Sequence, residues 1–168
     1  MTSEIRLERF DEPGVDAIYD RLVTLYAETH QDLAGNAFYT TDRFQDFLVK
    51  QRARPGFDLV AAWSGDRLVG VAFGFSRPAE QQFVFCELMV TPAFQGRGIA
   101  HRLHDELLGR RPEQQAVLLV RKDNAGARTA YQKWGWMKIG DLRPTPEAPN
   151  FDELALPLRT RPGADGRY

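Results

Sequence analysis

Apolar and polar positions recur along the chain with the periods of strands and helices. Seven segments alternate between apolar and polar residues or are apolar throughout, as β-strands are. The predicted strands are Ile5–Phe10, Phe57–Trp63, Arg67–Phe75, Gln82–Val90, Ala116–Val120, Trp136–Ile139 and Phe151–Leu158. Four other segments repeat apolar residues at the three- and four-residue spacing of amphipathic helices. The predicted helices are Pro13–Tyr26, about Thr41–Leu48, Gly96–Gly109 and Asn124–Trp134.

The order of these elements, βααβββαβαββ, predicts an α/β fold in a single domain. We expect a mixed, mostly antiparallel sheet of about six to seven strands, flanked by about four helices. Gln82–Val90 is apolar on both faces, which is typical of a strand in the middle of a sheet. Ser64-Gly65-Asp66 is a hairpin turn between two strands, and the Thr41 hydroxyl can cap the helix that follows it.

Length and composition indicate one folded domain. The chain has 168 residues, of which 43% are apolar, and this is enough to bury a substantial core. We expect the domain at 4–158 and a polar, frayed tail at 159–168. Lys and Arg number 22 against 23 Asp and Glu. This balance predicts no nucleic-acid partner and no attraction to an anionic membrane.

Cysteine content and hydropathy suit a soluble, cytoplasmic protein. Cys86 is the single cysteine, which excludes an internal disulfide and suits a reducing compartment. The segment Met1–Phe10 is rich in charge and lacks the apolar core of a signal peptide. No apolar run is long enough to span a bilayer. A homodimer is compatible with these features.

The most informative stretch runs from Leu88 to Ala100, where a strand turns at Pro92 and enters a helix through Gly96 and Gly98. Glycines at such a junction let the backbone approach a ligand closely, and the first amides of a helix favour an anion such as phosphate. Arg97 adds a charged donor. A bare glycine pair also fits a simple tight turn, so the motif alone leaves both interpretations open. The Rossmann pattern fails because position 101 is His101, and no P-loop Gly-Lys-Ser/Thr is present.

Two motifs carry a resemblance to a known family. Gln95-x-x-Gly98-x-Ala100 resembles the coenzyme A pyrophosphate loop of the GNAT superfamily of N-acetyltransferases. Asn124-x-x-Ala127-x-x-x-Tyr131-x-x-x-Gly135-Trp136 resembles the family's later motif, with Trp136 in place of the common Phe. The order of elements matches as well, so the resemblance covers about residues 4 to 158.

The resemblance implies acetyl-CoA as cosubstrate and assigns residues to bind it. Backbone groups of Leu88, Met89 and Val90 are expected to pair with the pantetheine arm, and an amide near Met89 or Val90 to serve the oxyanion. The remaining expected coenzyme A contacts are Gln95, Gly96, Arg97, Gly98, Ile99, Ala100, Asn124, Ala127 and Tyr131. Asn124 also suits a plain helix N-cap, and both roles can hold together.

Two residues are candidates for acid–base chemistry. The resemblance places Tyr131 beside the thioester sulfur, where its phenol can protonate the leaving thiolate; packing on the core is the alternative. Glu87 lies in an otherwise apolar strand, and burial of a carboxylate raises its pKa toward the range of a general base. A salt-bridged or unreactive Glu87 is the alternative, with a water chain or bulk solvent taking the proton. A bulge expected in this strand could redirect its side chain.

Other conspicuous residues suggest packing or solvated surface. Cys86 has the neighbours of a small buried residue, not of a nucleophile. His101, His104 and Asp105 share a helix face, which we interpret as solvated, with no metal site. The three tryptophans are expected to pack in the core or at helix ends: Trp63, Trp134 and Trp136.

The resulting hypothesis is an acyl-CoA-dependent N-acetyltransferase in which a primary amine attacks acetyl-CoA directly in a ternary complex. The alternative is a GNAT-fold module that binds an acyl-CoA without turnover, as a sensor or structural protein. The acceptor is expected to be a small-molecule or peptide amine. In this family its binding site is shaped by the first helices and their loop, here about Leu25 to Phe44, and by the connection of the last strands. Polar residues of that segment hint at a cationic or polar amine: His30, Asp32, Tyr39 and Asp42. The sequence leaves the acceptor and the acyl-chain preference open.

Overall fold

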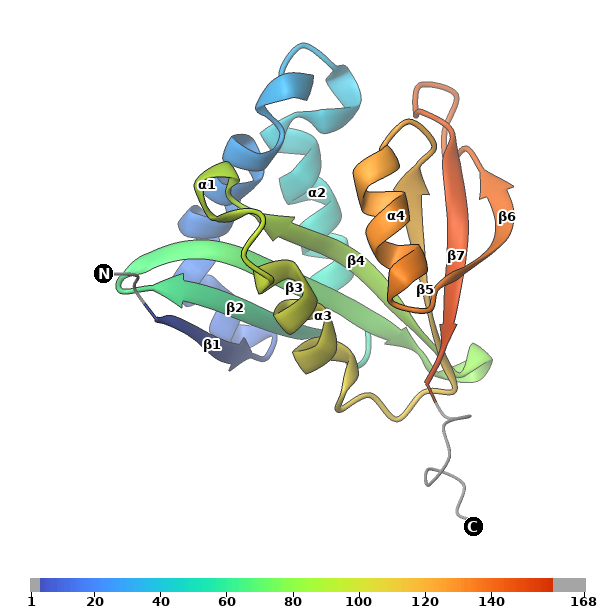
Figure 1. Ribbon diagram of the computed structural model, residues 1–168, viewed down its shortest axis with the longest axis horizontal. Coiled ribbons are helices and arrows are strands. Elements are labelled where there is room, and N and C mark those ends of the chain that lie inside the picture. Colours follow the sequence, from blue (N-terminus) through green and yellow to red (C-terminus); the bar gives the residue numbers. More distant parts are fainter. Residues whose placement is uncertain (1–3, 159–168) are drawn as a thin grey trace. The chain divides into compact units, whose positions relative to one another are not determined.

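The computed structural model describes residues 4–158, which form two compact units (Figure 1). The first unit runs to Phe75 and resumes from Cys86 to Arg110. The second comprises Ser76–Phe85 and the described residues from Arg111 onward. Strand β4, Gln82–Val90, belongs to the second unit at its start and to the first at its end. The tail expected at 159–168 lies outside the described residues.

Seven strands pair in the order β1-β2-β3-β4-β5-β7-β6. The strands are β1 Ile5–Phe10, β2 Asp58–Ser64, β3 Arg67–Arg77, β4 Gln82–Val90, β5 Gln115–Arg121, β6 Met137–Leu142 and β7 Phe151–Pro157. β4 and β5 pair in parallel, whereas β1–β2, β2–β3, β5–β7 and β6–β7 are antiparallel. The predicted mixed, mostly antiparallel sheet is confirmed, and so is the position of the apolar strand β4 in its middle.

Four α-helices occur among the described residues, as expected, together with short 3-10 turns. The α-helices are α1 Tyr19–Thr29, α2 Thr41–Arg52, α3 Ile99–Leu108 and α4 Ala125–Lys133. The 3-10 turns are η1 Pro13–Ile18, η2 Gln31–Leu33, η3 Ala37–Tyr39, η4 Pro78–Glu80 and η5 Pro92–Phe94. The helix predicted from Pro13 therefore begins as η1, whose buried residues Val15 and Ile18 are three apart, the repeat of a 3-10 helix.

The cap predicted at Thr41 was wrong by one residue. Thr40 caps α2, because its Oγ1 accepts the N–H of Arg43 at 3.1 Å while Thr41 is already helical. Thr40 has the extended backbone that an N-cap needs, with φ −79° and ψ 155°. The segment His30–Thr40, which lies between α1 and α2, holds the 3-10 turns η2 and η3.

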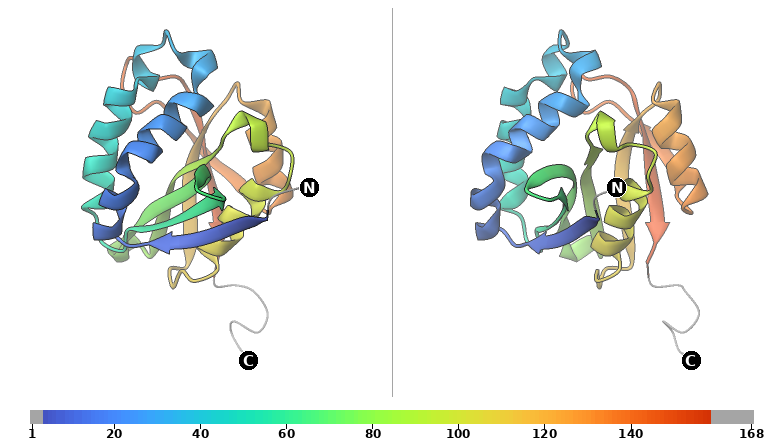
Figure 2. Two further views of the ribbon diagram at one scale, coloured as in Figure 1. Left: turned by 90° about the vertical axis from the view of Figure 1, so that its left-hand side faces the viewer. Right: turned by 60° about the vertical axis from the view of Figure 1, so that its left-hand side comes forward.

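In the first unit, α1 and α2 lie side by side on one face of β2 and β3 (Figure 2). Alternate β2 residues, Leu59, Ala61 and Trp63, are buried in this helix–sheet core. The intervening Val60 and Ala62 are also fully buried, and α3 packs against β2. The sheet is therefore covered on both faces here, which explains why β2 and β3 are apolar nearly throughout.

Candidate functional site

The junction between β4 and α3 is built on two left-handed glycines. Gly96 and Gly98 have φ of 79° and 80°, a conformation that other L residues adopt at a cost. A Cβ added at either position would meet no heavy atom within 4 Å, so open space lies beside this backbone. Gly98 is the N-cap residue of α3 and has no side chain to cap the first helical amides. These amides and the positive end of the helix dipole suit an anion.

Side chains around the glycines brace the turn. Gln95 donates from Nε2 to the Val90 carbonyl at 2.9 Å, which ties the loop to the end of β4. The exposed Arg97 donates to the Ala93 carbonyl at 3.3 Å, and its guanidinium lies 4.7 Å from the Phe94 ring centroid. Ile99 is buried and anchors the first turn of α3. The contacts of Gln95 and Ile99 thus hold the backbone on either side of Gly96 and Gly98, while the space beside these two glycines stays open.

Glu87 carries a carboxyl whose pKa is raised toward neutral pH. Its residue surface is partly accessible, but burial raises the pKa of its carboxyl to about 7. The Glu87 charge in turn adds to the burial that raises the pKa of Tyr26. Arg43 opposes that rise, and Tyr39 contributes to it. Glu87 therefore belongs to a group of interacting titratable side chains from β4, α1, η3 and α2.

Aromatic rings from α1, η3 and α2 surround this group. The Tyr26 ring stacks on His30 at a centroid distance of 4.0 Å and on Phe44 at 4.3 Å. His30 stacks in turn on Tyr39 at 5.8 Å. The His30 Nδ1 lies 2.9 Å from both the Tyr26 carbonyl and the Thr29 hydroxyl, and the tautomer of the ring decides which of these contacts it donates to or accepts from. The stacked rings of Tyr26, His30, Tyr39 and Phe44 form an aromatic wall beside the group around Glu87.

The end of β4 is also tied to α1 through polar contacts. Thr91 donates from Oγ1 to the Glu28 carboxylate at 3.1 Å, and the Thr29 hydroxyl lies 3.5 Å from the Met89 sulfur. Met89 is buried in the core below α1. These contacts fix the residues that follow Glu87, whose backbone is the expected partner of the pantetheine arm. That pairing and the expected bulge in β4 stay predictions.

In the second unit, Asn124 and Tyr131 lie at opposite ends of α4. Asn124 caps the helix, because its Oδ1 accepts the Ala127 amide at 3.2 Å. The half-buried Tyr131 ring packs edge-on against Trp134 at 5.7 Å and Trp136 at 5.8 Å. The predicted capping role of Asn124 is confirmed. The coenzyme A contacts of Asn124, Ala127 and Tyr131 and the acid role of Tyr131 stay predictions.

Several predictions for other residues changed with the structure. Cys86 is only half buried, although it packs against the core as expected. Trp63 and Trp136 are buried, as predicted. His104 is buried and not solvated, because it lies beside Leu103 and Leu107 on the inner face of α3. Burial lowers the pKa of its imidazole, an effect that the neighbouring Asp105 opposes.

The sequence identified only part of the group around Glu87. His30 and Tyr39 lie in the aromatic wall, whereas Asp32 and Asp42 are exposed and are not among its contacts. Tyr26 and Arg43 were missed, because Tyr26 fits the apolar face of a helix and Arg43 looks like a surface cation. A usable signal was the four-residue spacing of Tyr26 and His30, which puts both rings on one face of a helix.

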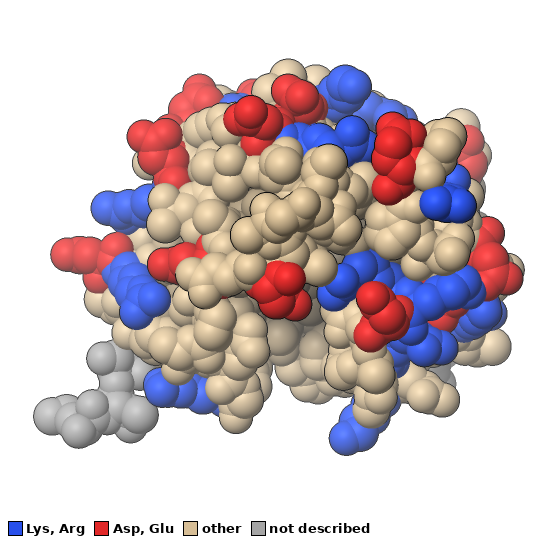
Figure 3. Space-filling model, turned by 90° about the horizontal axis from the view of Figure 1, so that it is seen from above, with Lys and Arg blue, Asp and Glu red and all other residues tan. Residues whose placement is uncertain are grey.

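Acidic and basic side chains are interspersed on the face shown in Figure 3. Among the described residues, no helix is both long and apolar enough to cross a membrane.

Comparison with known proteins gives a consistent result. The family model described as an acetyltransferase (GNAT) domain matches residues 26–144. A relative, the N-alpha-acetyltransferase RimI of Mycobacterium tuberculosis, is 37% identical over 94 residues, which is 54% of this chain and 59% of that protein. The chain thus matches little more than half the length of this relative.

Solved structures share the fold over nearly the whole chain. The ribosomal-protein-S18-alanine N-acetyltransferase of Escherichia coli has a TM-score of 0.71 at 17% identity, covering 98% of this chain and 99% of that one. The PaiA N-acetyltransferase of Thermoplasma acidophilum, solved in complex with coenzyme A, has a TM-score of 0.67 at 12% identity, covering 92% and 99%. At these identities the likeness concerns the fold alone.

Proposed function

This chain belongs to the GNAT acetyltransferase family, and we propose that it moves an acetyl group from acetyl-CoA to a primary amine. The observation that carries the proposal is the open glycine turn at the start of α3. Its backbone at Gly96 and Gly98 faces empty space, and no Cβ fills the volume that a diphosphate needs. Unlike the similarly open Gly65 in the β2–β3 turn, these glycines lie beside the first amides of a helix, which favour an anion.

The residues present fit acetyl-CoA, whose thioester carbonyl would be the electrophile. The amides of 96–100 would hold the pyrophosphate, with Arg97 as an exposed cation beside them. Backbone groups of Leu88, Met89 and Val90 would pair with the pantetheine arm, and an amide at Met89 or Val90 would donate to the oxyanion. Asn124 and Ala127 complete the proposed set.

Glu87 is the proposed general base. A neutral amine must attack, so the ammonium form of the acceptor has to lose a proton first. A carboxylate with a pKa of about 7 is half ionised at neutral pH and still basic enough to take that proton. Tyr131 is the proposed acid, because a phenol can give its proton to the departing thiolate. The neutral amine would add to the thioester carbonyl, and the resulting oxyanion would then expel the thiolate, which takes the proton of Tyr131. Of the two protons that the ammonium group loses, one would leave through Glu87 and the other would restore the Tyr131 phenol.

The same pKa favours an α-amino group over a lysine side chain as the acceptor. An α-ammonium group has a pKa of roughly 7.7–8.0 and a lysine ammonium one of roughly 10.4. Transfer to a base of pKa about 7 is uphill by about 1 pKa unit for the former and by more than about 3 for the latter. We therefore propose a peptide N-terminus as the acceptor, in line with the mycobacterial relative, which is an N-alpha-acetyltransferase.

The test measures thiol release from acetyl-CoA with a panel of amines near neutral pH. Short peptides with free N-termini are compared with the same peptides blocked at the N-terminus but containing lysine, and with small polyamines. We expect turnover with the free N-termini and little with the blocked peptides. Turnover with lysine alone would contradict the α-amine acceptor but not the transferase. Coenzyme A binding without turnover on any amine would favour the non-catalytic acyl-CoA module.

A further inference from the structure

Helix α3 carries three metal-ligating side chains one turn apart. His101, His104 and Asp105 stand at positions i, i+3 and i+4, so their side chains share one face of the helix. The side chains of His101 and Asp105 are 49% and 63% exposed, whereas that of His104 is 5% exposed. The group therefore straddles the boundary between the buried and the solvated side of α3, with one firmly packed member and two accessible ones.

The distances between their ligand atoms suit a small metal ion. The His104 Nδ1 lies 2.9 Å from one Asp105 oxygen, and the His101 Nε2 lies 3.4 Å from the other. One ligand atom from each of the three residues can be chosen so that all three lie within 4.8 Å of one another. A tetrahedral zinc ion with bonds of about 2.0–2.1 Å has ligand atoms about 3.3 Å apart. Small rotations of the two exposed side chains would reach that spacing.

We propose that His101, His104 and Asp105 form a binding site for a divalent transition-metal ion, with zinc as the best fit. Two imidazoles and one carboxylate are a common set of zinc ligands when water takes the fourth position. The same set disfavours Mg²⁺ and Ca²⁺, which require mostly oxygen ligands. Binding through Nδ1 of His104 replaces its hydrogen bond to Asp105 and places the imidazole proton on Nε2.

The position of the site gives the ion a structural role. A metal that bridges residues 101, 104 and 105 cross-links the first and second turns of α3. These turns follow directly on Gly98, where the proposed pyrophosphate site lies. The ion would stabilise the helix in the folded protein only, which raises the melting temperature by mass action. The site does not depend on acetyl transfer and stands or falls separately from it.

The experiment is a titration of the full chain, with any affinity tag removed, with Zn²⁺ alone. A chromophoric chelator competes for the ion, so that the stoichiometry and affinity follow from its absorbance. We expect one equivalent bound at micromolar concentrations, at least tenfold weaker binding in His101→Ala and Asp105→Asn, and no comparable binding of Mg²⁺. Both substitutions lie at exposed positions, so the variants should fold. Zinc should raise the melting temperature of the wild type but not of the variants.

The matched control is His30→Ala, because His30 is the one histidine of the 3 in the chain that lies outside the proposed site. Zinc affinity in this variant should equal that of the wild type. Equal zinc affinity in the wild type, His101→Ala and Asp105→Asn would overturn the site, as would a wild type that binds no zinc at micromolar concentrations.

Discussion

A carboxyl whose pKa lies near 7 makes the stability of the fold depend on pH in the neutral range. The folded-state pKa of Glu87, about 7, is above the ordinary value of 4.5. The folded protein therefore binds the proton more tightly than the unfolded chain, and stability falls as the pH rises from about 4.5 to about 7. In Glu87→Gln this loss is absent. We expect the variant to gain up to about 3 kcal/mol relative to the wild type between pH 4.5 and pH 8, measured by urea unfolding at several pH values. A constant difference between the two proteins would show that Glu87 ionises freely in the fold.

The same substitution tests the proposed base. With a peptide acceptor, the wild type should lose kcat/KM as the pH falls below about 7, where Glu87 takes up a proton. Glu87→Gln should be slower by about 10²-fold near neutral pH, and the gap should narrow as the pH approaches the pKa of the amine. Steady-state rates from pH 6 to 9 report this. A pH–rate profile of unchanged shape in Glu87→Gln would show that water, and not Glu87, takes the amine proton.

Substitution of Tyr131 tests whether its phenol protonates the leaving thiolate. Tyr131→Phe keeps the ring that packs against Trp134 and Trp136, so stability should change little. If the phenol protonates the thiolate, kcat should fall by about 10²-fold while acetyl-CoA affinity stays nearly constant. Pre-steady-state rates and a binding titration separate these two effects. An unchanged chemical step would mean that the thiolate leaves without this acid.

At the scale of elements, the start of α3 is the feature on which coenzyme A binding depends. Gly98→Val places a branched side chain in the open space beside the backbone, where the pyrophosphate is expected. We expect at least a tenfold loss of coenzyme A affinity in a calorimetric titration. A valine at positive φ is also strained, so Gly65→Val is the matched control. Gly65 has φ +59° and open surroundings in the β2–β3 turn, outside the proposed pyrophosphate site. Equal affinity in both variants would show that coenzyme A does not bind at the glycine turn.

At the scale of the whole molecule, the order of the elements was readable because apolar periodicity reports burial directly. The central place of β4 followed from its two apolar faces. The first residue of α2 could not be predicted in this way. Thr40 and Thr41 offer the same hydroxyl, and only the backbone conformation decides which of them caps the helix. The glycine turn was predictable because a positive φ demands glycine.

The surroundings of Glu87 were not predictable to the same extent, because they depend on contacts between residues far apart in the sequence. Tyr26 and Arg43 affect the electrostatics of this group only once α1, α2 and β4 are packed. The burial of His104 was missed for a related reason. A histidine tolerates either side of a helix, and its neighbours Leu103 and Leu107 decided the outcome.

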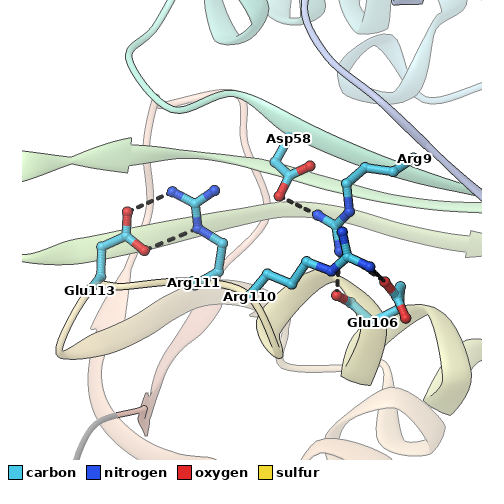
Figure 4. A network of polar contacts seen from close by, with 6 residues as sticks. All are labelled: Arg9, Asp58, Glu106, Arg110, Arg111 and Glu113. Carbon is cyan, nitrogen blue, oxygen red and sulfur yellow. Dashed lines mark hydrogen bonds and ion pairs between the residues drawn. The ribbon is translucent and has the colours of Figure 1, made fainter.

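Distant parts of the first unit are joined by a half-buried ion-pair network (Figure 4). Arg9 of β1 donates to Asp58 of β2 at 2.5 Å, and to the carbonyl and carboxylate of Glu106 in α3 at 2.6 and 3.1 Å. Its side chain is 24% exposed and that of Asp58 only 14%. One guanidinium therefore links the first strand, its neighbour in the sheet and the helix that carries the proposed pyrophosphate site.

Removal of this guanidinium should be costly, because it leaves the Asp58 carboxylate poorly solvated and without this partner. We expect Arg9→Ala to lose about 2–3 kcal/mol of unfolding free energy in urea. Arg6→Ala on the same strand is the matched control, since the Arg6–Glu8 pair is exposed at 60% and 45%. An exposed pair contributes roughly 0–1 kcal/mol. Part of the Arg9 effect is lost packing of its long stem, so Arg9→Met, which keeps an apolar stem, should recover only a fraction of the loss. Equal stability of Arg9→Ala and Arg6→Ala would show that the network contributes no more than a surface ion pair and that packing alone holds β1 and α3 to the sheet.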